Sequence, residues 1–318
     1  MATFSLGQAW ITKITTSEQP DLPVMGLDLS PLPNAEERNA FLGELSRSEA
    51  VREISRRKWL KLSQAIGKDK VAERANALLE FLTTSRTDVP AYAMFKGRRP
   101  AEKRDLVEEV ATRAWITHVT EVAQLHRSTS AFKASDITND FIRSIAKLST
   151  NPQGPRLALE AVRELGVCAI AESGLPGMSV DGVSFHTNQT GPVLAMTLRH
   201  DRLDNFWFTL FHELGHIRLH LSKPSEEVFV DSDENESDEF EAEAEANAFA
   251  KDSLVPRDTW SRSGAHRLGS EGSVIQLAKQ LGVHPAIVAG RIRYERRDFR
   301  IFTDLIGLDK VRETVFSA

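Results

Sequence analysis

The segment from Asp204 to His220 constrains the fold of this chain more than any other part. Its body is strongly apolar, and Asp204 or Asn205 is placed to cap a helix at its start. On a helix of 3.6 residues per turn, His212 and His216 lie on one face, where two imidazole nitrogens can reach the same ion. The sequence therefore predicts an apolar helix that offers two metal ligands from one turn.

Glu213 lies at the edge of that histidine face. A carboxylate there can hydrogen-bond a water molecule on the metal without binding the metal itself, so we expect Glu213 to act as a general base. Catalytic zinc usually keeps three protein ligands and one open position, which means that a third ligand is required. Because Cys168 is the only cysteine, Cys-rich zinc sites are excluded, and the donors must be histidine and carboxylate. We expect one zinc ion per chain.

A second helix, predicted from Glu239 to Pro256, is the source of carboxylates for this site. Its acidic residues fall on two faces, so that at most one pair can point at the metal; the pairs are Glu239 with Glu243 and Glu241 with Glu245. Spacing alone leaves the choice open. Two histidines on a helix are also common as plain surface or core residues, and the acids could all face solvent.

The rest of the chain divides at its turn-forming residues. Asn151 to Pro155 is a strong breaker, helical periodicity precedes it, and three short apolar runs follow it at 167–171, 182–186 and 192–198. We predict an α+β fold that is mainly helical, with a small antiparallel sheet packed on the helix of the two histidines. The predicted divisions are an irregular arm at 1–33, a helical domain at 34–150, a metal-binding domain at 151–260, and a helix-turn-helix-like extension at 261–318.

The amino-acid composition indicates the class of protein and its expected location in the cell. Of the 318 residues, 41% are hydrophobic and 27% charged, which is typical of a globular protein. No run approaches the roughly eighteen apolar residues of a membrane span, and the first residues do not resemble a signal peptide. A cytoplasmic protein without membrane contact is therefore expected. The formal net charge of the chain is -5. Negative charge is concentrated in residues 221–250, which contain eleven acidic residues and one basic residue, Lys223.

Three blocks, in order, resemble the ImmA/IrrE metallopeptidases, intracellular proteins with this histidine pattern that are commonly associated with helix-turn-helix repressors. The blocks are 206–220, then 243–250 with 254–256, and 283–291. The resemblance implies that Glu243 is the third zinc ligand. It also implies a zinc endopeptidase that cuts a partner protein, a helix-turn-helix transcriptional repressor, and so relieves repression of a stress, mobile-element or toxin–antitoxin system.

The chain departs from many such relatives at its start. Those relatives begin with a repressor-type DNA-binding domain, whereas residues 1–50 are too short and too rich in proline to hold one. Residues 276–292 do resemble a helix-turn-helix, followed by basic residues, so Arg291 and Arg293 are candidates for contact with a substrate or with DNA. Direct DNA binding is not favoured over substrate docking.

Other histidines have weaker claims. His200 and His284 are candidates to donate to the oxyanion of a tetrahedral intermediate. His220 lies about 12 Å along the helix from His212, given a rise of about 1.5 Å per residue, and is expected to be structural rather than a ligand.

A second function of a different class stays open: a non-catalytic, antitoxin-like regulator with a structural metal site, whose C-terminal helices bind DNA or a partner.

Overall fold

A computed structural model describes residues 35–60, 77–78, 81, 103–125, 131–221, 228–232, 241–308 and 310–316. The chain forms two compact units, Met1–Val122 with Gly174–Ser179, and Ala123–Ser173 with Val180–Ala318. The predicted arm at 1–33 lies outside the described residues, and the four predicted domains stay a prediction. In the described part of the chain, no helix is long and apolar enough to cross a membrane.

The described part of the first unit is helical. It contains α2 (Ala35–Arg47), α3 (Glu49–Arg56) and most of α5 (Lys103–Leu125), which lie where the sequence shows helical periodicity before Asn151. Ser48 caps α3 by accepting a hydrogen bond from the backbone N–H of Val51 at 3.3 Å. Ile54 and Trp115 are fully buried, so these helices have an apolar core within their own unit.

The second unit holds the sheet. Its strands are β1 (Cys168–Ala171), β2 (Val180–Thr187), β3 (Gly191–Met196) and β4 (Val228–Ser232), in the order β1-β3-β2-β4. The β2–β3 hairpin and the β2–β4 pair are antiparallel, but β1 runs parallel to β3. The sheet is therefore mixed: β3 lies between β1 and β2, and β4 occupies the other edge of β2. The predicted antiparallel sheet is corrected on this point, whereas the mainly helical α+β fold is confirmed.

The strand β4 was not predicted from the sequence. It lies in the acidic segment, where the short run from Val228 to Val230 is flanked by charged residues on both sides. Its pairing with β2, which places Val230 opposite Val183, supplies the main-chain hydrogen bonds that local sequence does not reveal.

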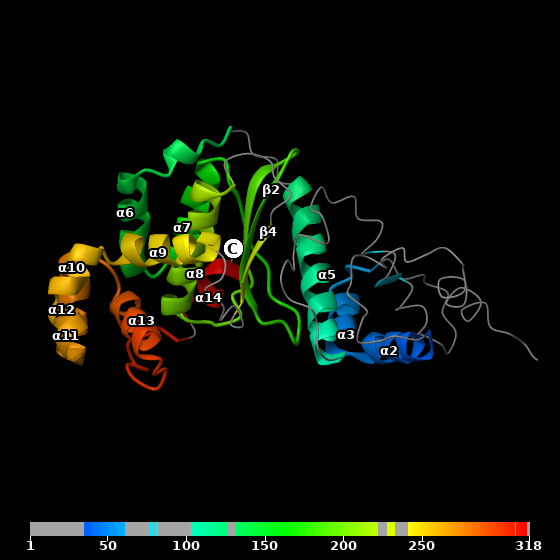
Figure 1. Ribbon diagram of the computed structural model, residues 1–318. Coiled ribbons are helices and arrows are strands. Elements are labelled where there is room, and N and C mark those ends of the chain that lie inside the picture. Colours follow the sequence, from blue (N-terminus) through cyan, green and yellow to red (C-terminus); the bar gives the residue numbers. More distant parts are fainter. Residues whose placement is uncertain are drawn as a thin grey trace, which may run out of the picture. The chain divides into compact units, whose positions relative to one another are not determined.

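Two helices pack on the sheet, α7 (Gly154–Glu164) and α8 (Leu203–Leu219), as Figure 1 shows. The helix predicted from Asp204 or Asn205 begins slightly earlier, with Arg202 as its N-cap. The reason is tertiary: the backbone N–H of Leu203 donates to the carbonyls of Ile306 and Gly307, and so the first turn is held by the C-terminal segment.

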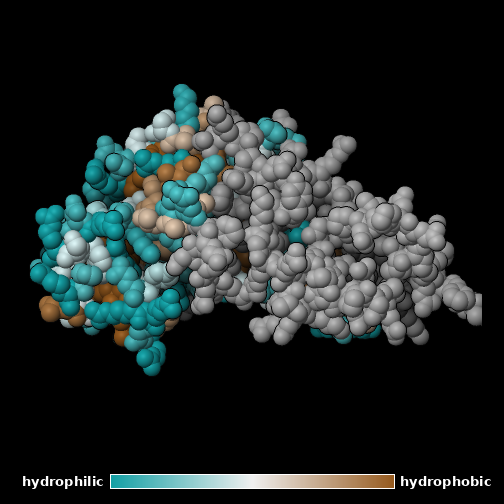
Figure 2. Space-filling model, in the orientation of Figure 1, coloured by the Kyte–Doolittle hydropathy of each residue, from teal (hydrophilic) through white to brown (hydrophobic). Residues whose placement is uncertain are grey.

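The described part of this unit contains further helices. The helices are α6 (Asn139–Lys147), α9 (Glu241–Leu254), α10 (Arg257–Arg262), α11 (Gly264–Leu268), α12 (Glu271–Leu281), α13 (Pro285–Arg296) and α14 (Arg312–Phe316). The unit also contains two short 3-10 helices, η3 (Ala134–Asp136) and η4 (Leu148–Thr150). Gly282, with φ of 70°, ends α12 in the left-handed conformation and makes the predicted turn before α13. Figure 2 shows scattered brown, apolar atoms on the largely teal surface of these C-terminal helices, where Leu268 and Phe299 are exposed.

Candidate metal centre

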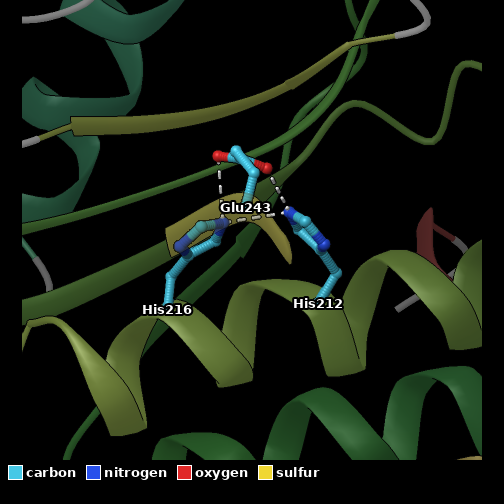
Figure 3. Close-up of side chains that lie close together, drawn as sticks. All are labelled: His212, His216 and Glu243. Carbon is cyan, nitrogen blue, oxygen red and sulfur yellow. Dashed lines mark hydrogen bonds and ion pairs between the residues drawn. The ribbon is translucent and has the colours of Figure 1, made fainter. Parts of the chain in front are cut away.

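Helix α8 presents His212 and His216 toward one point. Their side chains are buried, and their Nε2 atoms lie 3.0 Å apart. Leu210, Phe211 and Leu214, on the same helix, are fully buried in the core of the unit. Because the helix is fixed along its length by this packing, both imidazole rings are held on one face of α8, as Figure 3 shows.

Helix α9 brings Glu243 over the two rings. Its Oε2 lies 3.3 Å from Nε2 of His212, and its Oε1 lies 3.3 Å from Nε2 of His216. The close crossing of α8 and α9 depends on Gly215, since a Cβ there would lie only 3.1 Å from Cα of Ala246. The structure thus brings together the three residues that the resemblance implied. Glu239, the other acid of its predicted pair, lies outside the described residues.

The protonation states of this cluster suit a cation. Burial alone would raise the pKa of Glu243, but hydrogen bonds from His212 and His216 outweigh it and lower the pKa to about 2. Burial lowers the pKa of His216 to about 4, against the opposing effect of Glu243. At neutral pH, Glu243 is therefore a carboxylate and His216 a neutral imidazole with a lone pair to donate.

The spacing of the donors fits a tetrahedral metal ion. One ligand atom from each of His212, His216 and Glu243 lies within 4.8 Å of the others, and among the described residues no other such group of His, Cys, Asp or Glu is found. Bonds of about 2.0–2.1 Å to tetrahedral zinc place ligand atoms about 3.3–3.4 Å apart. The measured separations of 3.0–3.3 Å are close to this value. Two imidazoles and one carboxylate are also a donor set that catalytic zinc uses.

Glu213 is fully buried between α8 and the strand β2. The hydroxyl of Ser184 donates to its Oε2 and, at 3.2 Å, to its backbone carbonyl. Opposite the carboxylate lies Gly182, where an added Cβ would come within 2.8 Å of Thr209 and closer still to Glu213 Oε1. The sheet therefore provides both the space and a hydrogen bond for the carboxylate predicted to be the base.

His216 has a second partner on its other ring nitrogen. Its Nδ1 lies 3.2 Å from Nδ1 of His220, and Nε2 of His220 lies 2.9 Å from Oε2 of Glu245. His220 is thus structural, as expected, and Glu245 meets His220 while Glu243 meets the two ligand histidines. A metal ion on Nε2 of His216 would leave the proton of that ring on Nδ1, from which it would be donated to Nδ1 of His220, while the Nε2–H of His220 would be donated to Glu245.

The other predicted site residues do not belong to the cluster of His212, His216 and Glu243. His284 is the N-cap of α13, where its Nδ1 accepts from the N–H of Ala286 at 3.1 Å, and His200 is half-buried in the loop before α8. Their predicted role as oxyanion donors stays a prediction.

Arg293 is 3% exposed, and this burial argues against the predicted contact with DNA or a substrate. Arg291 bonds Glu295 at 2.9 Å and the carbonyl of Val255 at 2.8 Å, which engages its guanidinium within the fold.

Comparison with known families confirms the resemblance read from the sequence. Residues 166–293 match the model of the IrrE N-terminal-like domain, Peptidase_M78. This stretch of the chain is similar to an IrrE N-terminal-like domain. The matched range contains His212, Glu213, His216 and Glu243, together with the sheet, helices α8, α9 and α12, and most of α13. At the level of the family this is a metallopeptidase domain. The chain has no match among the curated proteins.

Sequence reasoning missed several residues of the IrrE N-terminal-like domain that surround the cluster. Ser184 and Gly182 reach Glu213 only because β2 lies against α8, and nothing in their local sequence marks them. Phe208 stands one turn before His212, with ring centroids 6.1 Å apart. The spacing of four residues was a usable signal for Phe208, since residues i and i+4 share a helix face.

Proposed function

We propose that this chain is a zinc-dependent endopeptidase that hydrolyses a peptide bond in a partner protein. The observation that carries the proposal is the convergence of His212, His216 and Glu243 beside the buried carboxylate of Glu213. A merely structural metal site needs a fourth ligand and no neighbouring base, whereas this arrangement supplies three ligands and a carboxylate held apart from them.

The residues divide the chemistry between them. Zinc bound by His212, His216 and Glu243 would supply a Lewis acid that polarises a carbonyl and makes water more acidic. Glu213 takes a proton from the attacking water and delivers it to the leaving amine. Ser184 fixes that carboxylate through its hydroxyl, so that the proton is accepted at a defined position.

The proposed substrate is a helix-turn-helix transcriptional repressor. This part of the proposal rests on the resemblance to ImmA/IrrE proteins and on their common association with such repressors. Cutting the repressor would relieve repression of a stress, mobile-element or toxin–antitoxin system. The alternative, an antitoxin-like regulator that binds DNA through its C-terminal helices, has less support because Arg291 and Arg293 on α13 are engaged or buried within the fold.

The decisive test uses Glu213→Gln, which keeps the shape of the side chain but removes the base. We expect wild-type protein and variant each to bind about one zinc per chain, and the variant to cut a helix-turn-helix repressor substrate about 10²–10⁴-fold more slowly. Zinc content by elemental analysis and fragments by mass spectrometry are the two readouts.

Glu241→Gln is the matched control, because Glu241 is an exposed acid on α9 that lies outside the donor cluster. It should keep both zinc and full cleavage. If wild type and Glu213→Gln cut at the same rate, the base is misassigned. If neither cuts and both bind operator DNA or the repressor equally well, the regulator takes the place of the peptidase.

A further inference from the structure

An open cavity of about 100 Å³ lies between α8, the C-terminal end of α9, and α13. Leu254 and Ile287 are buried in its lining, whereas Tyr294 and Phe299 are more than half exposed. The buried pair forms the inner wall, and the exposed aromatic pair forms the mouth. The cavity therefore opens to solvent at one end and is closed by the core at the other.

Phe208 connects this cavity to the metal centre. Its ring lines the cavity and stacks with the ring of Tyr294, with centroids 6.1 Å apart and an interplanar angle of 25°. The same ring lies 6.1 Å from the imidazole of His212. A group in the cavity would thus contact a ring that neighbours one of the three metal-ligand candidates.

The charged residues around the cavity already have partners within the fold. Arg202 pairs with Asp204 at 2.9 Å, and Arg291 pairs with Glu295 at 2.9 Å. The ammonium of Lys251 lies over the ring of Tyr294, 4.7 Å from its centroid. What the cavity offers an incoming group is consequently its aromatic and aliphatic walls rather than an unsatisfied charge.

We infer that this cavity is the specificity pocket of the peptidase, and that it takes a large apolar side chain, such as that of Phe or Leu, from a residue flanking the cleaved bond. The inference rests on the proposed function and adds to it the class of substrate sequence. A volume of about 100 Å³ is on the scale of one such side chain. Asn205, half-buried in the lining and on α8, is the position from which the pocket can be filled.

The test measures binding rather than cleavage. Two hydroxamates that differ only in their side chain, benzyl or methyl, are titrated calorimetrically into the zinc-loaded full-length protein. Because the benzyl group buries more apolar surface, we expect it to bind roughly tenfold more tightly or better than methyl. Asn205→Trp should reduce this ratio to about one, while methyl binding changes little.

Asn188→Trp is the matched control, since Asn188 is exposed in the β2–β3 turn and does not line the cavity. It should keep the wild-type ratio, and equal melting temperatures would show that both variants fold. Equal binding of the two hydroxamates to wild type, or a ratio unchanged in Asn205→Trp, overturns the inference. A changed oligomeric state with an unchanged ratio would make the cavity a contact between copies and overturn it as well.

The outcome is separable from that of the proposed function. Hydroxamate binding requires the metal but not the base, so a benzyl preference in a protein that cuts nothing would keep the pocket and reject the peptidase. If wild type does cut peptides, a digest of mixed peptides should show large apolar residues on one side of the cleavage site. Cleavage with no such preference would support the peptidase function and contradict the assignment of the cavity as its specificity pocket.

Discussion

His216 is held from two sides, and only one of them was predicted. Its Nε2 meets Glu243 and His212, while its Nδ1 meets His220, which in turn meets Glu245. A partner on the second nitrogen fixes both the tautomer and the orientation of a ligand imidazole. His220 is therefore a positioning residue, which acts on the metal centre through His216 without touching it.

We predict that His220→Ala weakens zinc binding about 10–100-fold, as is typical for loss of a residue that orients a ligand. Competition with a chromophoric chelator measures the affinity. His266→Ala is the control, because His266 is exposed on α11, away from the cluster. Equal zinc affinity in the two variants would show that the contact between His220 and His216 has no positioning role.

The crossing of α8 and α9 decides whether the ligands meet. His212 and His216 come from α8 and Glu243 from α9, so the distance between the helices sets the size of the site. Gly215 lies at their contact, where an added Cβ would lie 3.1 Å from Ala246 and 3.1 Å from Phe249. A side chain at this position requires Ala246 and Phe249 to give way by a few tenths of an ångström, and a larger side chain requires more.

We predict that Gly215→Val destabilises the protein by about 1–3 kcal/mol and weakens zinc binding, because the β-branched side chain separates Glu243 from the histidines. Urea unfolding and chelator competition measure the two effects. Gly272→Val is the control, since a Cβ at Gly272 on α12 would meet nothing within 4 Å. Zinc affinity preserved in Gly215→Val would mean that the helix crossing tolerates a wider spacing than we infer.

The stability of the whole molecule is linked to the protons of the cluster. Burial lowers the pKa of His216 from 6.5 to about 4, and the pKa of Glu243 falls from 4.5 to about 2. In each case the unfolded chain binds protons at a higher pH than the folded one. The stabilising contribution of His216 is therefore complete above its unfolded pKa and is lost as the pH falls toward its folded pKa.

For protein stripped of metal by a chelator, we predict that the free energy of unfolding falls between pH 6.5 and pH 4, with a contribution from His216 on the order of 2–3 kcal/mol. Urea unfolding at a series of pH values measures it. His216→Phe should flatten this pH dependence, whereas His266→Phe on exposed α11 should keep it. Parallel curves for wild type and His216→Phe would assign the acid sensitivity to other groups.

The sequence by itself determined what lies within one helix. His212, Glu213 and His216 are placed by backbone geometry alone, and the long helices α5, α7, α8 and α13 follow from their periodicity and turn residues. Even the choice of Glu243 over Glu245 needed a resemblance, because both lie near the start of α9 and spacing does not say which face meets α8. Hydrophobic periodicity of 3.6 residues is a local property of the sequence, so it can be recognised without knowledge of the fold.

Only the tertiary structure decided what lies between elements. The parallel pairing of β1, the strand β4, the seat of Glu213 against Ser184, and the cavity beside Phe208 all join segments far apart in the chain. Burial also reassigned Arg293, which looks like a surface cation in the sequence but is enclosed in the fold. The physical reason is that packing distances and burial depend on which faces of distant segments meet, and local propensity carries no record of that choice.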